Sequence, residues 1–151
     1  MDNVEWPAPD PPPLEVKKYG LDATPEERAA LDAQVYVFAP GIIKFTEAPM
    51  LSPTQYEVYE AKLKRLAEEY DEFRLLIDLT FVVVRPNAAD RAWLKKLFLP
   101  LTSKISACAV YTGKNFLLNM AAKFVLGGLN FKQLSVNKTR EQALEALGYV
   151  P

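Results

Sequence analysis

The stretch that decides the fold is Arg74–Val84, with the sequence RLLIDLTFVVV, together with the loop Arg85–Ala89 that follows it. This run is short, apolar and rich in β-branched residues, and amphipathic helical patterns lie before and after it. Such a run is typical of a strand that is buried on both faces in the middle of a sheet. Because a central parallel strand needs helices on both sides, we predict an α/β domain whose functional residues gather at the carboxyl ends of the strands.

The composition fits one soluble domain without enzymatic activity. The chain has 151 residues, of which 50% are apolar and 25% are charged, and this is enough to form a substantial core. It contains no histidine, which removes the commonest general base and every Ser-His or Cys-His nucleophile pair. The single cysteine, Cys108, lies in an apolar run and is expected to be a buried core residue. We therefore expect a protein that is not an enzyme and that holds neither a metal nor a cofactor.

Apolar runs and charge distribution also bear on location and partners. No apolar run reaches the roughly 18 residues of a membrane span, and Met1–Pro13 is acidic and proline-rich, unlike a secretory signal. These observations predict a cytoplasmic protein. Residues 81–151 carry 10 basic against 3 acidic side chains, a net charge of +7. The basic residues are spread over several elements without interleaved aromatic residues, so we expect solvated helix faces and no nucleic-acid partner.

The rest of the chain supplies the other elements of a mixed sheet. Residues 1–33 are expected to form a proline-rich arm, with a weak strand pattern at Leu14–Tyr19 and a short helix after Thr24, and residues 34–151 the α/β domain. Two strand patterns, 34–39 and 42–46, flank Pro40-Gly41 and predict a hairpin. Further helices are predicted after Ser52, after Asn87, at 116–126 and after Thr139, and further strands at 105–112 and 131–136. We predict about five strands with helices packed on them.

The order of these elements resembles the STAS fold. The resemblance is carried by LIDLT (76–80) with its following turn and helix, by Ala107–Gly113, and by TREQAL (139–144); it covers about residues 35–149. It is closest to bacterial proteins similar to anti-sigma-factor antagonists (SpoIIAA-like proteins). In that family the turn after the Asp-Leu strand carries Asp-Ser-Ser-Gly, whose second serine is phosphorylated. The corresponding residues here are Pro86, Asn87, Ala88 and Ala89, so the resemblance implies a protein-interaction module of signalling without the phosphoserine switch.

A small anionic or lipid-like ligand is the alternative to a protein partner. Parallel strands bring their carboxyl ends and the following helix N-termini to one edge of the sheet. The residues expected there are Arg85, Asn87, Thr112, Gly113, Lys114, Asn115, Asn137, Lys138 and Thr139. The turn at Gly113–Asn115 is shorter than a phosphate-binding loop, so ordinary turn and cap chemistry competes with anion binding. Asp78 has two interpretations as well, as a catalytic carboxylate or as an acceptor for loop amides.

The helix predicted at 116–126 is more apolar than one core-facing side requires. Its polar positions Asn115, Asn119 and Lys123 recur every four residues and leave a narrow polar stripe. Core packing accounts for one side of this helix. The excess predicts an interface with a second copy or a protein partner, to which the proline-rich arm would add, and we expect Leu118 to point outward. The interface candidates are Phe116, Leu117, Leu118, Phe124 and Val125.

Overall fold

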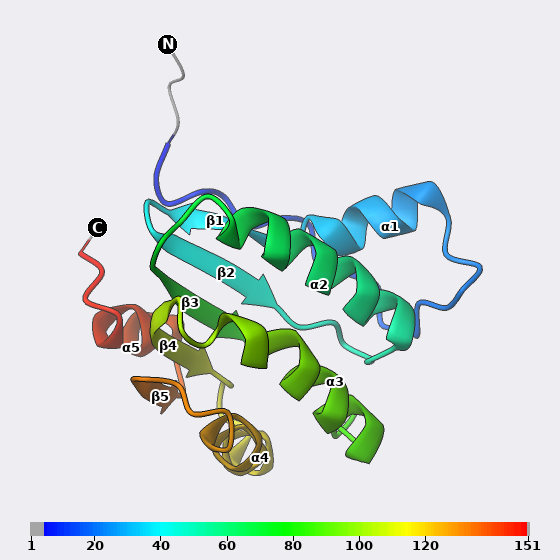
Figure 1. The fold of residues 1–151 in the computed structure, drawn as a ribbon. Coiled ribbons are helices and arrows are strands. Elements are labelled where there is room, and N and C mark those ends of the chain that lie inside the picture. The colour runs from blue at the N-terminus through cyan, green and yellow to red at the C-terminus, as the bar shows by residue number, and fades with distance from the viewer. Residues whose placement is uncertain (1–4, 151) are drawn as a thin grey trace.

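The structure, a computed structural model, describes residues 5–150 as an α/β domain with five strands and five α-helices (Figure 1). The strands are β1 (Val35–Ala39), β2 (Ile42–Thr46), β3 (Phe73–Asp78), β4 (Ile105–Tyr111) and β5 (Leu134–Asn137). The helices are α1 (Pro25–Asp32), α2 (Pro53–Ala67), α3 (Ala88–Phe98), α4 (Phe116–Gly127) and α5 (Arg140–Ala146), with a 3₁₀ turn at Leu99–Leu101.

The five strands form one mixed sheet in the order β1-β2-β3-β4-β5. The hairpin strands β1 and β2 are antiparallel, with a register shift between Val37 and Ala39, and β2 to β5 run parallel to one another. Strand β3 is the middle strand and pairs with both β2 and β4, as its apolar sequence predicted. The predictions of an α/β class and of a mixed sheet of about five strands are confirmed.

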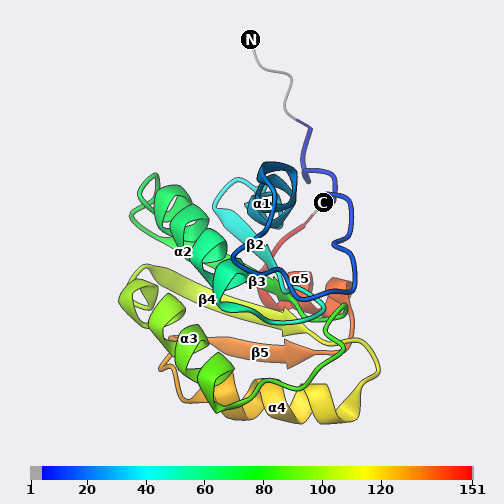
Figure 2. The ribbon, with the colours of Figure 1, turned by 90° about the vertical axis from the view of Figure 1, so that its right-hand side faces the viewer.

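The two faces of the sheet are covered unequally. Helices α2, α3 and α4 lie on one face, where the larger core joins Tyr59, Leu63, Phe98 and Leu126 to the inward residues of the strands, and α1 adds Leu31 (Figure 2). Cys108 belongs to this core and is buried, as expected. The other face carries the short helix α5, whose Ala143 packs in a smaller cluster. The thinly covered face therefore has room for polar side chains at the strand ends.

Side-chain caps fix the starts of the helices. Thr24, Asn87 and Thr139 each form a reciprocal capping box, and Ser52 accepts a hydrogen bond from the backbone N–H of Gln55. These side chains satisfy N–H groups that have no partner inside the first turn of a helix. All four caps occur where the sequence predicted them. Pro100 cannot continue an α-helix, and α3 ends at Phe98 and is followed by the 3₁₀ turn.

The central strand is shorter than predicted. It ends at Asp78, because the Oδ1 atom of Asp78 accepts hydrogen bonds from the backbone N–H and the hydroxyl of Thr80, at 2.8 and 2.6 Å, which turns the chain. Residues 79–86 are instead a loop, called the 79–86 loop below. Within it Val83 and Val84 are exposed, and the N–H of Val83 donates to the carbonyl of Pro49. The β-branched run after Asp78 is thus surface and not strand.

The strand predicted at Leu14–Tyr19 is also absent. This segment pairs with no strand and folds on itself, since the N–H of Glu15 donates to the hydroxyl of Tyr19 and the N–H of Lys17 to the carbonyl of Glu15. Tyr19 is buried in the larger core. The described part of residues 1–33 therefore packs onto the same core as residues 34–150.

Candidate functional site

An exposed apolar ridge runs along α4. Phe116, Met120 and Phe124 are spaced four residues apart, so they lie in line on one side of the helix, with Leu117 beside them. Their exposed fractions range from 53% for Met120 to 80% for Phe124. We call these four residues the α4 ridge. Three of them were predicted as interface residues, whereas Met120 was missed, although its spacing from Phe116 and Phe124 could have revealed it.

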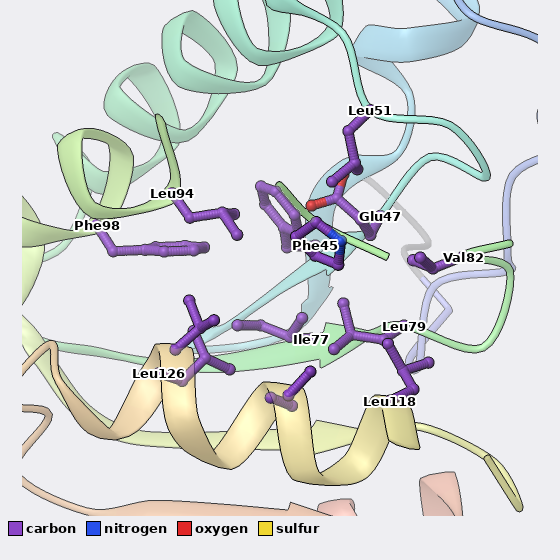
Figure 3. A pocket seen from close by; sticks show the side chains of 14 residues that line it. Phe45, Glu47, Leu51, Ile77, Leu79, Val82, Leu94, Phe98, Leu118 and Leu126 are labelled. Carbon is purple, nitrogen blue, oxygen red and sulfur yellow. The ribbon is translucent and has the colours of Figure 1, made fainter. Parts of the chain in front are cut away.

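The two other predicted interface residues lie on the inner side of α4. Leu118 and Val125 are half-buried and line a pocket between the sheet, α3 and α4, so the expectation that Leu118 points outward was wrong. The reason is helical geometry: Leu118 lies one turn from Ala122, which is buried against the sheet. Figure 3 shows Leu118 and Leu126 pointing from α4 into the pocket, Leu118 beside Leu79 and Leu126 nearer to Ile77.

This inner pocket is apolar and small, with a volume of about 40 Å³. Phe45 and Ile77 supply its floor from the sheet, and Leu94 and Phe98 extend into it from α3 (Figure 3). Glu47, directly after β2, is the ionisable side chain in its lining. We call this cavity the Glu47 pocket.

Burial shifts the carboxyl group of Glu47 toward its protonated form. Its Oε1 atom accepts hydrogen bonds from the backbone N–H of Ala48 at 3.0 Å and from Nε2 of Gln55 at 2.7 Å. Burial nevertheless dominates and raises the pKa of Glu47 to about 8, because these two neutral donors only partly offset the loss of water. Only its position directly after an apolar strand pattern distinguishes Glu47 in the sequence.

A groove of about 220 Å³ connects the α4 ridge with the 79–86 loop. It is bordered by Val83 and Val84 from the loop and by Leu117 and Leu118 from α4. Arg85, which was predicted to bind an anion, lies exposed at this groove together with Asn115. The apolar surface therefore continues from α4 onto the loop.

The residues predicted to bind an anion are divided between different places. Arg85 and Asn115 border the groove just described, whereas Asn137 and Lys138 line a shallow depression beside α5. Lys114 is exposed in the turn before α4, where Gly113 has a φ of 70°. Thr112 is buried and its hydroxyl donates toward the carbonyls of Gly113 and Asn137.

Three of these predicted residues use their side chains to cap helices. Asn87 accepts from the N–H of Asp90, Asn115 from that of Leu118, and Thr139 from that of Gln142. Cap chemistry was the competing interpretation of this edge, and it accounts for these three polar side chains.

The structure instead gathers charge on the α5 face of the sheet. Asp78 and Tyr111 are register partners at the ends of β3 and β4, Lys44 projects beside them from the middle of β2, and Arg140 reaches them from α5. Lys44 and Asp78 are each 2% exposed, and Nζ of Lys44 lies 3.8 Å from Oδ2 of Asp78. Asp78 accepts a hydrogen bond from the loop amide of Thr80, which agrees with its interpretation as an acceptor for loop amides.

Burial and the neighbouring charge of Arg140 lower the pKa of Lys44, while Asp78 and Asp10 act against this shift. Sequence reasoning missed Lys44. The signal was available, because a lysine in the middle of the apolar run IIKFT is unusual in a strand that is buried on both faces.

Comparisons with known proteins identify no relative, since no protein-family model, no curated protein and no solved structure matches the chain. Within residues 5–150 no helix has the length and apolar character needed to cross a membrane. The same residues contain no group of three or more His, Cys, Asp or Glu side chains arranged to hold a metal ion. The fold and its surfaces thus define a mixed α/β domain with an apolar ridge on one side of the sheet and a charged cluster on the other.

Proposed function

We propose that the protein is a non-enzymatic interaction and regulatory module of STAS-like type that forms a homodimer through the α4 ridge. The order of elements supports the STAS-like part: a hairpin, then alternating helices and parallel strands, then a short final helix. The turn into α3 carries Pro86 and Asn87, and α3 begins with Ala88 and Ala89; none of these residues has a hydroxyl group. Regulation by phosphorylation at this turn is therefore not part of the proposal.

The observation that carries the proposal is the area of the α4 ridge. Phe116 and Phe124 are 70% and 80% exposed. They leave about 300 Å² open if a whole aromatic side chain has about 200 Å². Leu117 and Met120 add to this, and Val83 and Val84 extend the surface onto the 79–86 loop. The largest apolar patch on a monomer is typically about 300–600 Å² and is often functional.

A second copy of the chain is the partner that this surface fits best. Lys123 is the only charged residue of α4, so the ridge itself offers no charge pattern for an acidic or basic partner. A straight ridge with four-residue spacing can pack against its own copy across a two-fold axis, where each phenylalanine enters the groove beside the partner's ridge. With the loop included, the surface approaches the roughly 800 Å² per partner of a standard interface.

Sedimentation of Phe124→Glu tests this proposal. We expect the parent to be a dimer and the variant a folded monomer, because a carboxylate at this position would be buried without a partner in the dimer. The circular dichroism spectrum should stay unchanged, since Phe124 is 80% exposed in the monomer, whereas the urea midpoint of the parent should depend on protein concentration and that of the variant should not.

Leu21→Glu is the matched control. Leu21 is 89% exposed and precedes α1, away from the α4 ridge. This variant should remain dimeric. A parent that sediments as a monomer at high concentration, or a Phe124→Glu variant that stays dimeric, would contradict the proposal.

A further inference from the structure

The carboxylate of Asp10 occupies a set of donors on the α5 face of the sheet. Its Oδ1 atom accepts from the hydroxyl of Tyr36 at 3.0 Å and from Nζ of Lys44 at 3.2 Å. Its Oδ2 atom accepts from Nη2 of Arg140 at 2.7 Å. The three donors come from β1, β2 and α5, and together they hold both oxygens of one carboxylate.

The donors Lys44 and Arg140 are held in place by the fold, whereas the carboxylate that they bind belongs to Asp10 in an extended arm. Lys44 is almost fully buried, and Nε of Arg140 donates to the hydroxyl of Tyr111 at 3.1 Å, which orients the guanidinium group. The side chain of Asp10 is 48% exposed and lies in the proline-rich segment 7–13.

Two hydrogen bonds hold this arm on either side of Asp10. The N–H of Ala8 donates to the carbonyl of Phe38 at 2.8 Å, and Nε2 of Gln34 donates to the carbonyl of Pro12 at 2.9 Å. Pro9, Pro11 and Pro12 lie within two positions of Asp10 and lack a backbone N–H. The arm can therefore donate few other backbone hydrogen bonds.

A pocket adjoins these donors. Its volume is about 480 Å³, within the range of about 300–1,000 Å³ found for sites of small molecules. Besides the charged residues, it is lined by Pro11–Pro13 of the arm, by Thr46 of β2, and by Phe81 of the 79–86 loop. The hydroxyl of Thr46 has no hydrogen-bond partner, although the residue is only 6% exposed. A buried hydroxyl without a partner is unusual and marks a polar position that a ligand would satisfy.

The charge of the cluster selects a monoanion. Without Asp10, the cluster holds Lys44, Arg140 and Asp78, which leaves one positive charge uncompensated. Partial burial alone would raise the pKa of Asp10, but the hydrogen bond from Arg140 and the charge of Lys44 lower it to about 2. One carboxylate therefore neutralises the cluster, whereas a dianion would leave it with one excess negative charge.

We propose that this cluster is a binding site for a small organic monocarboxylate and that Asp10 is the intrachain competitor for it. The ligand's carboxylate takes the place of the Asp10 carboxylate on Tyr36, Lys44 and Arg140. Its organic body fills the pocket against Phe81, and a polar group on it reaches Thr46. The site involves residues on the opposite face of the sheet from the α4 ridge, so homodimer formation is not required for binding.

Binding of cyclohexanecarboxylate, followed by calorimetry, tests the proposal, with cyclohexanecarboxamide as the uncharged analogue. Asp10→Asn keeps the shape of the side chain but removes its charge. The apparent affinity of the parent equals the intrinsic affinity multiplied by the fraction of molecules in which Asp10 has left the site. If that fraction is about one tenth or less, Asp10→Asn should bind at least about tenfold more tightly. The amide should not bind.

Two further variants locate the binding. Adding Arg140→Gln to Asp10→Asn should abolish it, because the strongest donor is lost. Asp32→Asn is the matched control: Asp32 also pairs with a lysine, Lys62, at 2.7 Å, but neither residue lines the pocket, and its replacement should leave affinity at the parent's value. Equal binding of acid and amide, no gain in Asp10→Asn, or unchanged binding after Arg140→Gln would show that the network is only structural and would overturn the proposal.

Displacement of the arm gives a second readout that needs no change at Asp10. The sequence has two tryptophans, Trp6 directly before the proline-rich segment 7–13 and Trp93 in α3, so Trp93→Phe leaves Trp6 as the sole reporter. Cyclohexanecarboxylate should alter Trp6 emission at high concentration, and the amide should not. If calorimetry detects acid binding while Trp6 emission stays constant, the ligand does not compete with Asp10 and the proposal fails.

Discussion

Replacing Glu47 with glutamine should make the stability of the protein nearly independent of pH in the neutral range. In the folded chain, burial raises the pKa of Glu47 from 4.5 to about 8, and the charge of Asp90 acts in the same direction. The folded state therefore keeps a proton that the unfolded state has lost. Stability falls as pH rises from 4.5 toward 8, and the loss is complete above the folded pKa. Glutamine keeps the oxygen that accepts from Ala48 and carries no charge.

The size of the effect follows from the shift. Each pH unit between the two pKa values changes the free energy of unfolding by about 1.4 kcal/mol. Between about pH 5.5 and about pH 8, the parent should lose about 2–3 kcal/mol relative to Glu47→Gln. The chain contains no histidine, so no other side chain has an ordinary pKa inside this window. Burial raises the pKa of the Cys108 thiol and so keeps that group protonated in the folded state.

Urea unfolding followed by circular dichroism at several pH values measures this difference. The slope of stability against pH should be steep for the parent and flat for Glu47→Gln. Glu57→Gln, at an exposed position of α2, is the matched control and should follow the parent, because water solvates that carboxylate in both states. Parallel profiles for the parent and Glu47→Gln would refute the reasoning, since they would mean that Glu47 is ionised in the folded protein.

Two other substitutions test the packing around the sites. Tyr59→Phe removes a hydroxyl that donates to the carbonyl of Thr46 at 2.6 Å, and urea unfolding should show a loss of about 1–2 kcal/mol because that buried carbonyl loses its partner. Asn87→Ala removes the side-chain cap of α3 and should lower the free energy of unfolding by about 1 kcal/mol; an unchanged urea midpoint would mean that water replaces the cap.

The elements that were predicted well have local signals. Thr24, Ser52, Asn87 and Thr139 cap their helices through residues only three positions further on, so the sequence contains the whole interaction. The central place of β3 could also be predicted, because its apolar run requires burial on both faces. The STAS-like identity, the homodimer and the absence of catalysis stay predictions.

Errors arose where one local signal competed with another. The run after Asp78 is rich in valine and favours a strand, but a side-chain turn at Asp78 and Thr80 ends the pairing first. Leu118 belongs to a helix that is apolar on most sides, so composition alone could not decide which leucine faces the sheet. The face of α4 was set by its packing on the sheet, where the helix lies against β5.

The charged cluster lies beyond local signals. Asp10 and Arg140 are separated by 130 positions in the chain and meet only because the arm crosses the sheet beside α5. No periodicity connects them. Lys44 could have been singled out by its apolar neighbours, but its partners Asp10 and Asp78 come from two other segments. Such a cluster cannot be predicted from a local pattern, because it forms only when folding brings the strands, the arm and α5 together.

The two proposed sites lie on opposite faces of the sheet, yet the 79–86 loop borders both. Phe81 lines the carboxylate pocket, whereas Val83 and Val84 border the groove beside α4. A second copy docked on the α4 ridge would restrict this loop and with it one wall of the pocket, which lowers the entropy cost of ordering that wall around a ligand. Such coupling is reciprocal: if dimerisation tightens carboxylate binding by some factor, the carboxylate must tighten the dimer by the same factor. The ratio of the carboxylate affinities of the parent and of the monomeric Phe124→Glu variant should therefore equal the factor by which the carboxylate strengthens the parent's dimer.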